Sequence, residues 1–134
     1  MIMERIARIR DILKTIDADG IIVYSPENRR YLSKFSGTTG YVIIGMNNAG
    51  FVTDFRYTEQ AAQQCIGYEI IKNDNPLTEY LADTINKYGI KNLAYEDDYM
   101  TVGFYDKLKE KLSDVNMIPL KESSGEIRIV KDED

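Results

Sequence analysis

The sequence contains no histidine anywhere in its 134 residues. Without an imidazole, the chain cannot use histidine as a general base, a zinc ligand or a phosphate carrier, which excludes most common hydrolytic mechanisms. Chemistry by this chain alone would need carboxylates, hydroxyls, tyrosines or lysines that converge on one point. We therefore assign no catalytic residue and no metal ligand to the sequence.

Cysteine is almost as scarce, because Cys65 is the only one. A single thiol cannot form a disulfide within the chain, and nothing around it in the sequence suggests an activated nucleophile. We interpret Cys65 as a small apolar side chain of the core.

Long basic runs and long apolar runs are also missing. The net charge is −5, and the lysine-rich stretch 107–111 is interrupted by Leu108 and Glu110, so nucleic acid is not an expected partner. No apolar run approaches the roughly eighteen residues that cross a bilayer, and residues 1–5 lack the apolar centre of a signal peptide. These features predict a cytoplasmic protein with no membrane partner.

What remains is the composition of one globular α/β domain, with 43% hydrophobic and 29% charged residues. Apolar side chains recur at intervals of three and four from Ile2 to Ile16, which predicts an amphipathic helix ended by Asp19 and Gly20. Residues 21–24 form a β-branched run that is typical of a strand buried on both faces. Ser25 and Pro26 then predict the N-cap and first position of a short helix.

The rest of the chain continues the alternation. We predict a hairpin of strands 41–44 and 51–53, helix 57–64, strand 68–71, a helix from Asn75-Pro76 to 88, strand 93–95, helix 101–112 and strand 115–118. Together these elements indicate a mixed sheet of about six strands with helices on its faces. Residues 1–120 form the predicted domain. Ser123 and Glu126 have capping-box spacing, so we interpret 121–134 as the start of a linker helix to a further domain.

Three segments carry a family resemblance. Residues 25–37 read SPENRRYLSKFSG, residues 53–61 read TDFRYTEQA, and residues 126–133 read EIRIVKDE. In this order and spacing they resemble the N-terminal domain of creatinase, prolidase and aminopeptidase P. Phe55 departs from the pattern, since that position of the second segment is often glycine in the family.

The resemblance implies a ribonuclease H-like domain that performs no catalysis itself. It implies that the full-length protein is an Xaa-Pro dipeptidase or aminopeptidase, in which a separate C-terminal domain holds two divalent metals, Mn or Co, and hydrolyses the bond before proline. The N-terminal domain would limit access to the catalytic cleft, often that of a neighbouring subunit. The implied partners are its own catalytic domain, a second copy in a homodimer and short proline-containing peptides. The alternative is a free-standing α/β binding or signalling module.

Polar residues beside the hairpin are the candidates for contact with substrate or with the catalytic domain. Antiparallel pairing should bring the segments on either side of the hairpin to one end of the sheet, which gathers Thr38, Thr39, Arg56 and Tyr57. For Arg56, an internal salt bridge to Glu59 or Asp54 is the competing interpretation. The acidic triplet 96–98 is interpreted as a solvated turn.

Overall fold

The computed structural model describes residues 2–37, 39–73, 77–112 and 114–120. Its elements match the predicted order, and the predicted helix start at Asn75-Pro76 and linker helix in 121–134 lie outside the described residues. The elements are α1 (Ile2–Thr15), β1 (Gly20–Val23), α2 (Pro26–Ser33), β2 (Tyr41–Gly45), β3 (Ala49–Thr53), α3 (Thr58–Gln64), β4 (Glu69–Lys72), α4 (Leu77–Lys87), β5 (Asn92–Tyr95), α5 (Val102–Lys111) and β6 (Asn116–Pro119).

The strands form one mixed sheet in the order β4-β3-β2-β1-β5-β6. β2 pairs antiparallel with both β1 and β3, whereas β4, β5 and β6 join through parallel pairs. The predicted α/β fold class, with a hairpin inside a mixed sheet, is confirmed.

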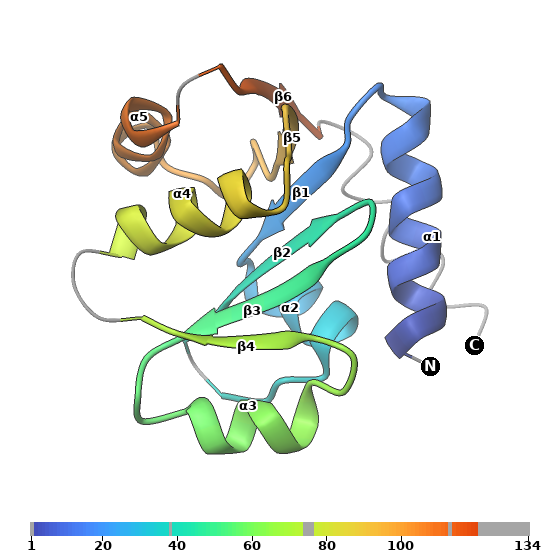
Figure 1. Cartoon of the computed structure of the whole chain (residues 1–134), viewed down its shortest axis with the longest axis vertical. Coiled ribbons are helices and arrows are strands. Elements are labelled where there is room, and N and C mark those ends of the chain that lie inside the picture. Colours follow the sequence, from blue (N-terminus) through green and yellow to red (C-terminus); the bar gives the residue numbers. More distant parts are fainter. Residues whose placement is uncertain (1, 38, 74–76, 113, 121–134) are drawn as a thin grey trace.

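Helices cover both faces of the sheet (Figure 1). Side chains of α1, α2 and α3 share one core cluster with Ile21 and Val23, and side chains of α4 and α5 share the other with Ile22. β1 therefore sends alternate side chains into two cores, and all four of its residues are buried. Full burial of one such side chain contributes about 1.5–3 kcal/mol, so this central strand anchors the loops at its ends.

Asp19 and Gly20 have a different role from the predicted helix stop. Gly20 is the first residue of β1, where a Cβ would lie 2.5 Å from Cδ1 of Ile90, so glycine lets the strand pass close to the segment after α4. Asp19 accepts hydrogen bonds from the backbone N–H groups of Lys91 and Asn92 at 3.0 and 2.8 Å. The pair joins β1 to β5 at this end of the sheet.

None of the helices in the described part of the chain combines the length and apolar character that crossing a bilayer requires.

Candidate functional site

Two of the three family segments, 25–37 and 53–61, begin at one end of the sheet, and the third, 126–133, lies outside the described residues. Val23 pairs with Val42, and Tyr41 pairs with Val52, so β1 and β3 end where β2 begins. β5 runs parallel to β1, with Ile22 opposite Tyr95, and it ends on the same side. The loops after β1, β3 and β5 and the loop before β2 therefore form one surface, which we call the motif end.

At this end, Thr39 is held through its backbone. The buried Thr53 hydroxyl donates to the Thr39 carbonyl at 2.7 Å, which ties the loop before β2 to the last residue of β3. Thr39 itself is half-buried. Thr38, the adjacent candidate, lies outside the described residues.

Arg56 forms an ion pair with Asp54 and not with Glu59. Its Nη2 and Nε donate to the two carboxylate oxygens of Asp54 at 2.9 and 3.2 Å. The hydrogen bond from Arg56 holds the pKa of the Asp54 carboxyl below its ordinary value. The Arg56 side chain still exposes 62% of its surface, so the pair leaves it accessible to a partner.

Tyr57 is only half exposed, because its ring packs edge-on against Phe35 with centroids 5.8 Å apart. The Arg56 guanidinium lies 5.3 Å from the centroid of the same ring. The structure thus brings Arg56 and Tyr57 together, with the Tyr57 ring serving as packing as well as surface.

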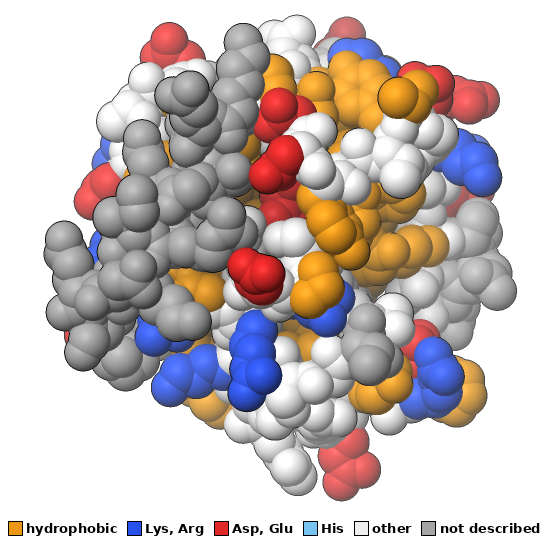
Figure 2. All heavy atoms as spheres, turned by 180° about the vertical axis from the view of Figure 1, so that it is seen from behind, with side chains coloured by type: hydrophobic (Ala, Val, Ile, Leu, Met, Phe, Trp, Pro, Cys, Tyr) orange, Lys and Arg blue, Asp and Glu red, His pale blue; other side chains and the backbone are white. Residues whose placement is uncertain are grey.

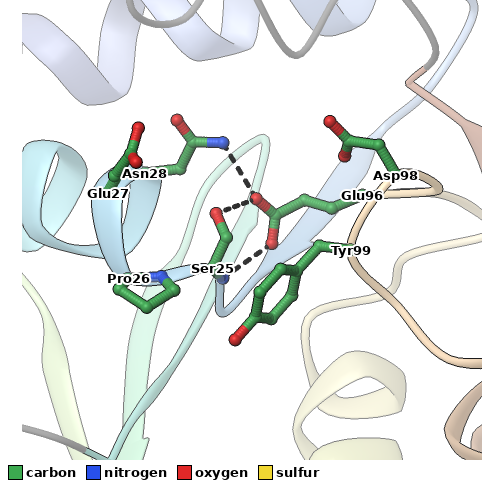
Figure 3. Close-up of a pocket in the computed structure, with 7 residues that line it drawn as sticks. All are labelled: Ser25, Pro26, Glu27, Asn28, Glu96, Asp98 and Tyr99. Carbon is green, nitrogen blue, oxygen red and sulfur yellow. Dashed lines mark hydrogen bonds between the residues drawn. The ribbon is translucent and has the colours of Figure 1, made fainter.

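Glu96 is where the interpretation of the acidic triplet was wrong. Asp97 and Asp98 are exposed, but Glu96 exposes 1% of its surface. Its carboxylate accepts hydrogen bonds from the Ser25 backbone N–H, the Ser25 hydroxyl and the Asn28 amide (Figure 3). The backbone N–H of Tyr24 is a fourth donor. A buried carboxylate with four donors is a structural clamp and not a solvated turn.

The same clamp changes the role predicted for Ser25. Ser25 is the N-cap residue of α2 and Pro26 follows it, but the Ser25 side chain makes no capping bond to the helix. Its hydroxyl donates to Glu96, which the parallel pairing of β5 with β1 places beside it. The signal was present only in the topology: two parallel neighbouring strands end directly before Tyr24 and Glu96.

An aromatic cluster lies next to this clamp. The Tyr24 ring contacts the rings of Tyr41, Tyr99 and Phe104, with centroid distances of 5.3, 4.9 and 5.2 Å. Burial, followed by the nearby Tyr41, Glu96 and Tyr99, raises the pKa of Tyr24 to about 12. These rings fill the motif end on the side of α5.

Two small pockets of opposite character share Pro26 as a wall. One, of about 180 Å³, is acidic and is lined by Ser25, Pro26, Glu27, Asn28, Glu96, Asp98 and Tyr99 (Figure 3). The other, of about 300 Å³, is basic and is lined by Pro26, Arg29, Arg30, Phe35, Ser36 and Gly37. On the face seen in Figure 2, acidic and basic side chains lie next to one another, with hydrophobic side chains between them.

Within the described residues, no group of three or more His, Cys, Asp or Glu side chains could hold a metal ion. Cys65 exposes 2% of its surface, and burial raises the pKa of its thiol to about 11. This confirms Cys65 as an inert core residue.

Comparisons with known proteins agree with the fold. The family model of the Creatinase/Prolidase N-terminal domain matches residues 5–130. A Bacillus subtilis protein named uncharacterized peptidase YqhT is 37% identical over 127 residues, which cover 95% of this chain and 36% of that protein. The chain thus spans about a third of the length of this curated relative.

Solved structures give the same picture. An Xaa-Pro dipeptidase from Bacillus anthracis superimposes with a TM-score of 0.86 and 38% identity, over 89% of this chain and 33% of that one. The isolated N-terminal domain of the cytoplasmic peptidase PepQ from Mycobacterium tuberculosis gives a TM-score of 0.84 and 25% identity, over 92% and 98% of the two chains. From its motifs, its sheet and these matches, the chain belongs to the Creatinase/Prolidase N-terminal domain family.

Proposed function

We propose that the chain is the non-catalytic N-terminal domain of an Xaa-Pro peptidase, a dipeptidase or an aminopeptidase, and that it shapes substrate access and subunit contacts. The observation that carries the proposal is the family match over residues 5–130 together with relatives about three times as long that are named peptidases. Because a shared fold does not by itself fix a function, the role of the domain rests on its residues.

The chemistry of the residues supports a non-catalytic role. The whole sequence has no histidine, and the described residues offer no cluster of metal-ligating side chains. The two divalent metals that we propose for the full-length enzyme, Mn or Co, would therefore be held by another part of a longer protein. There they would polarise the scissile carbonyl and activate water, as divalent metals do in peptidases.

We propose that the motif end faces the catalytic domain. Three large apolar side chains, Phe55, Tyr99 and Val102, expose 72%, 45% and 77% of their surface on the loops after β3 and β5 and at the start of α5. Exposed apolar side chains beside a charged residue such as Arg56 are typical of a protein–protein interface. We also propose a homodimer, for which the same exposed side chains offer a surface. The names of the Xaa-Pro relatives support short proline-containing peptides as substrates, and the name of the PepQ relative supports a cytoplasmic location.

The test compares the isolated chain with the full-length gene product, both purified with Mn²⁺ or Co²⁺. We expect the full-length protein to hydrolyse Xaa-Pro dipeptides or tripeptides and the isolated chain to hydrolyse neither. Turnover by the rigorously purified chain would overturn the non-catalytic assignment. A full-length protein without any Xaa-Pro hydrolysis, or a gene that encodes these 134 residues alone, would favour the free-standing binding module.

A further inference from the structure

Arg29 is a buried guanidinium with too few acceptors. It exposes 7% of its surface, and its Nη groups donate to the carbonyls of Tyr24, Gly40 and Gly37 at 3.4, 3.5 and 3.2 Å. Its Nε is buried and has no hydrogen-bond partner. A guanidinium has five N–H groups, so these three contacts leave two without an acceptor among the described residues.

The charge of Arg29 is also poorly compensated. None of the ion pairs among the described residues includes it, and the carboxylate of Glu96 is bonded to Tyr24, Ser25 and Asn28 instead. Burial accordingly lowers the pKa of Arg29. A buried cation that contacts only neutral carbonyls is stabilised when an anion is placed beside it.

The surroundings of Arg29 provide space for an anion. It lines the basic pocket of about 300 Å³ together with Arg30, Ser36 and Gly37, and none of the described residues in that lining is acidic. Arg30 follows Arg29 on α2 and is exposed. One guanidinium at the wall and a second at the rim form an arrangement that suits a planar acceptor with two oxygens.

We propose that this basic pocket binds a carboxylate, as found at the C-terminus of a peptide or on an Asp or Glu side chain. A singly charged anion is favoured over a phosphate dianion, because three carbonyl oxygens already surround Arg29 and Glu96 lies close by. The net charge of −5 on the whole chain adds to this preference. The proposal does not rest on a peptidase function, since it concerns binding by this chain alone.

The experiment is an NMR titration of the isolated chain, followed through the Arg29 Nε–H and Gly37 N–H signals. The probes are acetyl-Ala-Ala with a free C-terminus, the same peptide as its amide, and acetyl-Ala-Glu-Ala-amide, which carries only a side-chain carboxylate. We expect saturable shifts in the millimolar range with a carboxylate probe and none with the amide. Tighter binding of the first probe identifies a peptide terminus as the source, and tighter binding of the third identifies an acidic side chain. Equal shifts with the amide, or tighter binding of inorganic phosphate, would overturn the proposal.

Matched variants separate a built site from general charge attraction. Arg30→Gln removes one exposed positive charge from the pocket rim, and Lys14→Gln removes one from α1, away from the pocket lining. We expect Arg30→Gln to weaken carboxylate binding about fivefold or more, and Lys14→Gln to leave it unchanged. Arg29→Lys should lose about tenfold, since lysine keeps the charge without the planar fork. Equal losses in the Arg30 and Lys14 variants would show an unspecific effect, and the result holds even if Arg29→Lys fails to fold.

Discussion

Glu96 and Ser25, 71 positions apart in the sequence, are joined by two hydrogen bonds, one from the Ser25 backbone N–H at 2.9 Å and one from its hydroxyl. The bonds connect the loop after β5 to the start of α2, which carries the first family motif. The position of α2 at the motif end therefore depends on a residue that no motif contains.

Replacing Glu96 should destabilise the domain. In Glu96→Gln, one oxygen becomes an NH₂ group that faces donors, so at least one buried donor loses its acceptor. We expect a loss of about 1–3 kcal/mol in the free energy of unfolding, measured by urea denaturation. Asp98→Asn is the matched control, because Asp98 is exposed two residues away and should change stability by less than about 0.5 kcal/mol. Similar losses in both variants would refute the clamp.

The elements of this fold were predictable from sequence because their patterns are local. The spacing of Ile2, Ile6, Ile9 and Leu13 specifies the buried face of α1, and the run 21–23 specifies a strand with two buried faces. Antiparallel pairing of the hairpin also placed the two motif segments at one end. Each of these inferences used residues close together in the chain or a geometry that the hairpin fixes.

The site was less predictable because its contacts depend on the order of strands. Nothing local distinguishes Glu96 from the exposed Asp97 and Asp98, since its burial follows from the parallel pairing of β5 with β1. Arg29 was likewise read only as part of a motif. Its Nη1 donates to the carbonyl of Gly40, which directly precedes β2, and the pairing of β2 with β1 brings these two residues together.

Cys65 should be almost unreactive in the folded chain. The residue exposes 2% of its surface, and burial raises the pKa of its thiol to about 11, so little thiolate is present at neutral pH. We expect a thiol reagent such as DTNB to react at least about a hundredfold faster in concentrated urea than in buffer. Equal rates in the two conditions would mean that the α3 end of this core opens readily.

Glu69 should give a small pH dependence on the acid side. The hydrogen bond from Lys87 is the main cause that lowers the pKa of the Glu69 carboxyl below the ordinary 4.5, and the hydrogen bond from Tyr88 is the second. A lowered folded-state pKa contributes stability that is present above the unfolded value and is lost as the pH falls through the folded value. Glu69 is largely exposed, so the effect is small and salt-sensitive.

The measurement compares the thermal midpoints of the chain and of Glu69→Gln between pH 7 and pH 3.5. The original chain should be slightly more stable at pH 7, and the difference should shrink as the pH falls below about 4.5. A difference that grows towards acid would contradict the sign of the pKa shift.

Substitutions at Arg56 and Asp54 separate two roles for Arg56, a structural ion pair and a contact with a substrate or partner. If the proposed function is right, Arg56→Ala in the full-length enzyme should lower kcat/KM for short Xaa-Pro peptides by about tenfold, with metal content unchanged.

Asp54→Ala is the informative control, because it breaks the same ion pair but leaves the guanidinium in place. If Arg56 acts on a partner or a peptide, only Arg56→Ala should show the kinetic defect. If the pair only fastens the turn after β3, both variants should lower the thermal midpoint of the isolated chain, and neither should change kcat/KM in the full-length enzyme. Asp54→Ala should lower the midpoint more, because the Asp54 carboxylate also accepts a hydrogen bond from the Arg56 backbone N–H at 2.9 Å. That second pattern would end the functional interpretation of Arg56.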